Sequence, residues 1–271
     1  MTTILNGLSG MPVALHGFIV GYEPIRESIS LHGGSDHRYL LEPVTAAAVE
    51  YQDGWVLLDA GFNVPVIRDP RLRGETFNYD SYTAVVPPGD PLAEAVERAG
   101  LDWGDLRGCA ISHAHVDHTG GIRLTGEAPV VVQRREWQWV VDGAGFPEVV
   151  LPSDLLEASE RVVLLDGDAP LAPGLTAIDT AGHTPGHQSF RVELPSGTVV
   201  VLACDAADLR VNIDTRTPCG SADASEGFAL AQRSIDRLAD LAAAGEDVWP
   251  GHDPAWGPWV TAIETGLVTV R

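Results

Sequence analysis

Residues 112–121, with the sequence Ser-His-Ala-His-Val-Asp-His-Thr-Gly-Gly, hold four candidate metal ligands within six positions: His113, His115, Asp117 and His118. Alternate side chains of an extended segment project to the same side, so His113 and His115 can share one cation. Asp117 and His118 follow where the chain turns, and they can face a second cation beside the first. Imidazole and carboxylate ligands without thiolate suit Zn²⁺, Mn²⁺, Co²⁺ or iron. The segment therefore predicts a metal centre.

Three more candidate ligands lie further along the chain: His183, Asp205 and His252. Each follows a predicted strand, and strand ends are where loops gather and sites are built. Their convergence on the first cluster would bring together five histidines and two aspartates. By spacing alone, each of the three could equally be a turn, cap or surface residue. The dense cluster differs, because burying three histidines and an aspartate without a ligand would cost several kcal/mol.

The segment 113–118 resembles the His-x-His-x-Asp-His signature of the metallo-β-lactamase superfamily. The resemblance extends to Leu-Leu-Asp-Ala-Gly at 57–61, to Thr-Ala-Gly-His-Thr-Pro-Gly-His-Gln-Ser at 180–189 and to Pro-Gly-His-Asp at 250–253. It thus covers about residues 40–260. Within the superfamily, the second and third of these blocks most resemble the N-acyl homoserine lactonases.

This resemblance implies a four-layer αβ/βα sandwich of class α/β with a dinuclear metal site at one edge. It implies that His113, His115 and His183 bind one metal ion, with Zn²⁺ as the first expectation. It also implies a second ion, held by Asp117, His118 and His252, and a bridging Asp205. The expected reaction is hydrolysis of a lactone, most simply an N-acyl homoserine lactone of the quorum-quenching type. His187 is expected to orient a ligand rather than to bind metal.

One position departs from the family pattern. In those lactonases a tyrosine usually follows the bridging aspartate by three positions and contacts the substrate oxygen, whereas this chain has Asp208 there. A carboxyl group donates a hydrogen bond only when protonated, which requires a raised pKa. The expected catalytic set is Asp117, Asp205 and Asp208, with Asp117 or Asp208 delivering a proton to the leaving oxygen. Three loop tyrosines could supply the missing phenolic donor: Tyr22, Tyr79 and Tyr82.

The elements that must position these residues are predicted from hydrophobic patterning. Strands are expected at 46–51, 55–60, 109–112, 129–133, 161–165, 175–179, 188–194, 198–203 and 247–249, and helices at 91–100, 134–141 and 228–242. The Asp-Gly step at 53–54 predicts a hairpin turn. Two strand-rich halves, each with helices, indicate a layered α/β sandwich, and residues 1–271 are taken as one domain.

Residues 61–90 have no clear periodicity and are rich in Pro, Gly, Arg and aromatic residues. So long a connection without structure of its own is usually functional, and we expect it to shape the substrate pocket. Seven side chains could wall an apolar pocket: Met11, Phe18, Tyr22, Phe62, Phe77, Tyr79 and Tyr82. Trp256 and Trp259 could also approach the site, or they could pack under the last strand.

The composition narrows the choice of partners and compartment. The net charge is −21, with 17 basic residues that are all arginine, which disfavours nucleic acid and anionic membranes and favours a neutral or cationic small molecule. No apolar run is long enough for a transmembrane helix. The three cysteines are odd in number, and Cys109 and Cys204 lie in apolar runs, so a reducing, cytoplasmic location is expected. A homodimer is left open.

Three alternative functions share these ligands. The first is hydrolysis of another ester, a thioester or a phosphoester, although the short stretch after His252 and the absence of lysine disfavour the glyoxalase II type. The second is a persulfide dioxygenase, which uses one iron held by two histidines and one aspartate. The third is a metal-stabilised binding protein without activity, which the presence of all seven ligands disfavours.

Overall fold

The first sheet is built around a long antiparallel hairpin. The structure is a computed structural model that describes residues 3–76, 82–143, 149–222 and 226–271. The hairpin strands are β1 (Ala14–Arg26) and β2 (Tyr39–Tyr51). Ala46 and Ala48 pack into a core on one face of β2, and Ala47 and Val49 pack into a second core on its other face. The sequence predicted only 46–51 of this hairpin, which is the part of β2 that packs into both cores.

Within the described residues, the strands form one sheet of seven strands and one of five. The larger sheet has the order β12-β1-β2-β3-β4-β5-β6, and neighbouring strands from β3 to β6 are parallel. Its other strands are β3 (Gly54–Leu58), β4 (Leu106–Ala110), β5 (Val130–Gln133), β6 (Val162–Leu165) and β12 (Val268–Val270). The turn at 52–54 joins β2 to β3 as predicted.

The smaller sheet has the order β11-β10-β9-β8-β7, with β10 and β11 parallel and the other pairs antiparallel. Its strands are β7 (Ala169–Ala172), β8 (Leu175–Asp179), β9 (Gln188–Glu193), β10 (Val199–Leu202) and β11 (Asp247–Trp249). Every strand predicted from the sequence is present. Three were not predicted: β1, β7 and β12.

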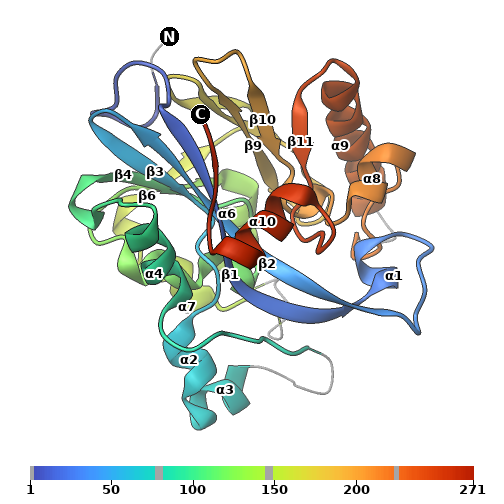
Figure 1. Ribbon diagram of the computed structural model, residues 1–271. Helices are drawn as coiled ribbons and strands as arrows, with labels where there is room; N and C mark the ends of the chain where they lie inside the picture. The colour runs from blue at the N-terminus through green and yellow to red at the C-terminus, as the bar shows by residue number, and fades with distance from the viewer. Residues whose placement is uncertain (1–2, 77–81, 144–148, 223–225) are drawn as a thin grey trace.

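The two sheets face each other, and helices cover their outer faces (Figure 1). Between the sheets, Leu58 of the larger sheet shares a core with Phe190 of the smaller one. The long helix α9 (Glu226–Ala243) covers the smaller sheet, where Leu238 packs in a core with Val201. On the far side, α4 (Pro91–Arg98) places Leu92 in the outer core of the larger sheet. The predicted four-layer αβ/βα sandwich is confirmed.

The remaining helices are short: α1 (Glu27–Ser30), α2 (Val64–Arg68), α3 (Pro70–Thr76), α5 (Val116–Thr119), α6 (Arg134–Val141), α7 (Pro152–Leu156), α8 (Arg210–Thr215) and α10 (Gly257–Thr265). The three predicted helices are present as α4, α6 and α9. Asp90 caps α4 as its sequence pattern suggests, since its side chain accepts a hydrogen bond from Ala93 N. Across the described residues, no helix combines the length and apolar character needed to span a bilayer.

The segment 61–90 is not the structureless connection that the sequence suggested. It contains α2 and α3, and Ile67 of α2 packs into the outer core of the larger sheet. Asn63 caps α2 by accepting a hydrogen bond from Val66 N. The sequence signal was weak because each helix is too short to show a 3.6-residue period.

Candidate metal centre

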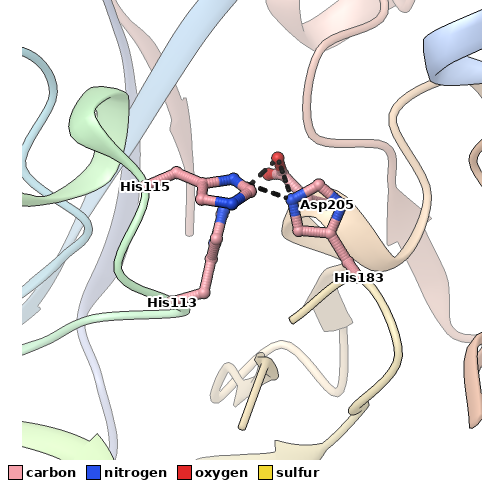
Figure 2. A group of neighbouring side chains, drawn as sticks. All are labelled: His113, His115, His183 and Asp205. Atoms are coloured by element: carbon pink, nitrogen blue, oxygen red, sulfur yellow. Dashed lines mark hydrogen bonds and ion pairs between the residues drawn. The ribbon is translucent and has the colours of Figure 1, made fainter. Parts of the chain in front are cut away.

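The predicted ligands lie where four strands end at the same edge of the sandwich. His113, His115, Asp117 and His118 follow β4, and they occupy the loop and the short helix α5. His183 lies in the loop between β8 and β9, Asp205 follows β10, and His252 follows β11. Figure 2 shows His113, His115, His183 and Asp205 pointing toward one another from three separate segments. The structure thus brings all seven predicted residues together.

The first group consists of His113, His115, His183 and Asp205, whose potential ligand atoms all lie within 4.8 Å of one another. His183 Nε2 lies 3.0 Å from His115 Nδ1 and 3.3 Å from Asp205 Oδ2. Burial lowers the pKa of His113 and of His183 well below the ordinary value. Neutral imidazoles direct lone pairs inward, which is the form that binds a metal ion.

Asp117, His118 and His252 form the second group. His118 Nδ1 donates to Asp59 Oδ2 at 2.9 Å, so its Nε2 turns toward Asp117 Oδ2 at 3.0 Å. His252 Nδ1 donates to the Pro43 carbonyl oxygen at 3.0 Å, so its Nε2 likewise turns toward a carboxylate. Against the effect of burial, the neighbouring carboxylates raise the pKa of His118 and of His252 well above the ordinary value. The second group therefore favours positive charge, which bound protons or a metal ion can supply.

These donor sets fit two cations with Asp205 between them. Asp205 Oδ2 faces the first group, while Asp205 Oδ1 lies 3.2 Å from His118 Nε2 and 3.0 Å from His252 Nε2. His113 Nε2 and His118 Nε2 are buried and have no hydrogen-bond partner among the described residues. Buried polar atoms without partners are rare in folded proteins, and one metal ion in each group would satisfy these two nitrogens.

Asp59 and Glu136 hold the ligand loops in place, and neither was predicted to do so. Asp59 ends the second predicted strand with a φ of 57°, and its Oδ1 accepts a hydrogen bond from Ser112 N at 2.6 Å. Glu136 is fully buried at the start of α6. Its two oxygens accept hydrogen bonds from Ala114 N and Gly186 N, both at 2.8 Å. It thereby joins the first ligand loop to the loop that carries the third histidine.

His187 lies behind Asp205 rather than in either group, as expected of an orienting residue. Asp205 N donates to His187 Nε2 at 3.1 Å, so the ring proton must be on Nδ1, which lies 2.9 Å from Thr180 Oγ1. Burial lowers the pKa of His187 to about 4, which keeps this neutral tautomer. The ring therefore fixes the backbone of the residue that faces both groups.

A cavity of about 200 Å³ opens onto the two groups. Part of its wall is apolar and comprises Ile25 of β1, Ile29 of α1, Val116 and Val149. The rest is acidic and comprises Glu23, Glu42, Asp117, Asp205 and Asp208. Among the described residues that line the cavity, none is an arginine. The cavity therefore has an apolar part and a strongly acidic part.

The expected apolar wall is largely wrong. Of the five proposed side chains that the structure describes, only Tyr82 lines the cavity; Phe18 and Phe62 are buried in the outer core of the larger sheet. Phe77 and Tyr79 lie outside the described residues. Four further side chains pack elsewhere: Met11 is exposed, Tyr22 pairs through its backbone with Val85, Trp256 lies under Arg210, and Trp259 packs against Trp249.

The acidic wall was not predicted from the sequence, apart from the predicted catalytic aspartates. Glu23 and Glu42 lie directly opposite each other on β1 and β2, and they are 7% and 1% exposed. Burial raises the pKa of Glu23 to about 8 and that of Glu42 to about 7. Burial, followed by the charge of Asp205, raises the pKa of Asp208 well above the ordinary value. Hydrophobic patterning did not reveal Glu23 and Glu42, because the predicted strand at 46–51 includes neither residue.

Comparison with known proteins agrees with this geometry. A sequence model of the metallo-β-lactamase superfamily matches residues 40–241. The chain is 29% identical to an N-acyl homoserine lactonase of a Bacillus species, over 78% of this chain and 81% of that protein. It is 31% identical to the N-acyl homoserine lactonase AttM of Azorhizobium caulinodans, over 84% of this chain and 89% of that one.

Solved structures show the same similarity. One is an N-acyl homoserine lactone hydrolase that holds the product N-hexanoyl-L-homoserine at its catalytic metal centre. It superposes with a TM-score of 0.78 at 25% sequence identity, over 90% of this chain and 95% of that chain. The similarity therefore extends over most of the fold.

Proposed function

Because the chain belongs to the metallo-β-lactamase superfamily and, within it, to the N-acyl homoserine lactonases, we propose that it is a metal-dependent hydrolase that opens a lactone ring. The observation that carries this proposal is the pair of donor groups that share Asp205 at the inner end of a cavity. His118 and His252 both turn Nε2 toward carboxylate oxygens, and divalent cations would bind this set of nitrogen and oxygen atoms. A lactone in the cavity would place its carbonyl group beside them.

We infer that two divalent ions bind here, with Zn²⁺ as the first choice for this donor set and Mn²⁺, Co²⁺ or iron as alternatives. His113, His115 and His183 would hold one ion. Asp117, His118 and His252 would hold the other, and Asp205 would contact both. Such ions, when bound, lower the pKa of water toward neutrality and polarise a carbonyl oxygen.

The chain's own residues would orient the substrate and handle the proton. Asp117 lies in the cavity lining beside the second group, where its carboxylate can accept a proton from water and return it to the departing ring oxygen. Asp205 is held by His187 through its backbone, so its carboxylate keeps a fixed direction. Asp208 takes the place of the family's tyrosine and faces the substrate as an acid rather than as a phenol.

The direct test is acid release from a panel of short- and long-chain N-acyl homoserine lactones and simple γ- and δ-lactones, with metal content measured on the same sample. We expect about two divalent ions per chain, loss of turnover with a chelator and recovery when metal is restored. Asp205→Ala should lose both activity and bound metal. His37→Ala is the control, because His37 is an exposed residue that belongs to neither group of ligands.

Two results would contradict the proposal. Full activity and full metal content in Asp205→Ala would refute the two-cation arrangement, which depends on this residue. One iron per chain together with oxygen uptake on a persulfide would assign the site to a dioxygenase. Esters, thioesters and phosphoesters belong in the same panel, because hydrolysis of one of them without lactone opening would retain the hydrolase and reject the lactonase.

A further inference from the structure

Three carboxyl groups line the cavity in addition to Asp117 and Asp205. Glu23 and Glu42 form a cross-strand pair on the hairpin, and Asp208 lies on the other side of His252. None of the three belongs to the expected ligand set. All three are more than nine-tenths buried: Glu23 is 7% exposed, Glu42 is 1% exposed and Asp208 is 5% exposed. A cationic ligand in the cavity would favour the ionised form of all three carboxyl groups.

Asp208 shows most directly that a partner is missing. Its Oδ1 is buried and accepts no hydrogen bond from any residue that the structure describes. A buried carboxyl oxygen without a donor costs free energy, and native structures rarely retain one unless a ligand or ion supplies the donor. Because Asp208 lines the cavity, a ligand in the cavity can reach this oxygen.

The surrounding protein compensates the two glutamates through neutral hydroxyl donors and through His252, which lower their pKa against the larger effect of burial. Ser30 Oγ donates to Glu42 Oε1 at 2.6 Å, which is a neutral donor. Among the described lining residues there is no arginine, and the chain has no lysine. The nearest positive charge would come from the cations of the metal centre. The His252 ring lies between Glu23 and that centre, because Glu23 Oε1 is 3.9 Å from Nδ1, whereas Asp205 contacts the opposite ring nitrogen, Nε2.

A third metal ion between Glu23, Glu42 and His252 is disfavoured by the hydrogen bonds. These three residues could supply ligand atoms within 4.8 Å of one another. His252 Nδ1, however, donates to the Pro43 carbonyl oxygen, which can only accept. Nδ1 therefore carries the proton and has no lone pair for a metal, and two carboxylates would be left as the only protein ligands.

We propose that the substrate of this site is a lactone that carries an ammonium group, which binds among Glu23, Glu42 and Asp208 while the ring lies at the metal centre. The inference rests on the proposed lactonase function and specifies its substrate class. An ammonium group offers three N–H donors and a positive charge, and it can approach the unpartnered Asp208 Oδ1 and the glutamate pair. The apolar residues Ile25 and Ile29 would contact the uncharged part of the molecule.

Two matched pairs of lactones test this with the metal-loaded enzyme. N-(6-aminohexanoyl) homoserine lactone is compared with N-heptanoyl homoserine lactone, which replaces the terminal ammonium by a methyl group. Unacylated homoserine lactone is compared with γ-butyrolactone, which lacks the ring ammonium. We expect kcat/KM to favour the cationic member of at least one pair by about tenfold or more, chiefly through KM, with a preference that falls as salt rises.

Binding of the corresponding lactams, measured by titration calorimetry, gives a second readout that does not depend on turnover. Glu42→Gln and Asp208→Asn should each reduce the cation preference, in kcat/KM and in Kd, toward a ratio of one. The control is Glu97→Gln, because Glu97 is an exposed glutamate on α4 and should leave the ratio unchanged. The ratio between matched compounds is the quantity compared, so a general loss of activity does not mimic the effect.

Equal turnover and equal binding of both members of both pairs would overturn the inference and leave the lactonase proposal intact. So would variants that weaken metal binding and both substrates alike, because the carboxyl groups would then only balance the charge of the cations. Three metal ions per chain, falling to two in Glu42→Gln, would also overturn it. If no lactone is opened at all, the proposed function fails, and lactam binding still decides whether the cavity prefers a cation.

Discussion

Glu136 is expected to support both the fold and the metal centre, although it is not among the expected ligands. Its carboxylate accepts hydrogen bonds from Ala114 N and Gly186 N, which are 22 and 50 residues away along the chain. Ala114 lies between two histidines of the first group, and Gly186 lies three residues after the third. Replacing Glu136 by alanine would leave two buried N–H groups without an acceptor.

The size of the effect follows from those two bonds. An orphaned buried donor costs about 1–3 kcal/mol, which gives about 2–6 kcal/mol for two. Burial raises the pKa of Glu136, so removing the carboxylate also relieves an unfavourable burial, and we expect a net loss near the lower end. For a chain of this size that corresponds to a fall in Tm of roughly 5–10 °C. Glu136→Gln should cost less, because the amide keeps one acceptor.

The assay is thermal unfolding with and without metal, together with metal affinity from competition with a chromophoric chelator. Glu136→Ala should lower Tm and weaken metal binding together, since the two ligand loops lose their common support. The exposed Glu97→Gln serves as the control for a lost charge on a helix. If Glu136→Ala unfolds within about 2 °C of the parent and binds metal equally well, the support that we assign to this carboxylate is refuted.

Three further predictions concern single positions. Burial raises the pKa of Asp154 from 3.8 to about 6. The protonated form therefore stabilises the fold, and this contribution is complete below about pH 4 and is lost as the pH rises through about 6. Asp154→Asn should therefore flatten the fall in unfolding free energy across this range, by about 3 kcal/mol at most; an unchanged pH profile of denaturant unfolding would refute the assignment. Asp59→Asn should weaken metal binding by about 10–100-fold without unfolding, because asparagine tolerates the positive φ but cannot hold His118 as a carboxylate does, and a chelator titration would detect it. A Cβ on Gly120 would lie 1.8 Å from a backbone nitrogen, so Gly120→Ala should lower Tm sharply while Gly257→Ala, which meets nothing within 4 Å, should not.

Much of the metal centre is determined locally in the sequence. The ligands from His113 to His118 lie within six positions, and their residue types and alternation are enough to predict a site. The strand predicted at 55–60 is also present, as β3, because its continuous apolar run is visible in the sequence and is buried on both faces. The resemblance to a known family then added the distant ligands, His183 and His252, whose spacing alone was not informative.

The tertiary structure alone decided which side chains the centre meets. Glu136 looks like an ordinary polar residue at the start of a helix, and only the fold brings its carboxylate to the two ligand loops. Glu23 and Glu42 lie on the outer part of the hairpin, where the buried positions are polar and the neighbouring Leu41 is exposed, so hydrophobic alternation does not mark the element. Their opposition depends on the register of the hairpin. Phe62 looked like a pocket residue and is a core residue, because burial depends on which layers enclose a side chain. Hydrophobic pattern and motif are local properties of the chain, whereas the charge and shape of a cavity arise from residues that become neighbours only when the sheets pack.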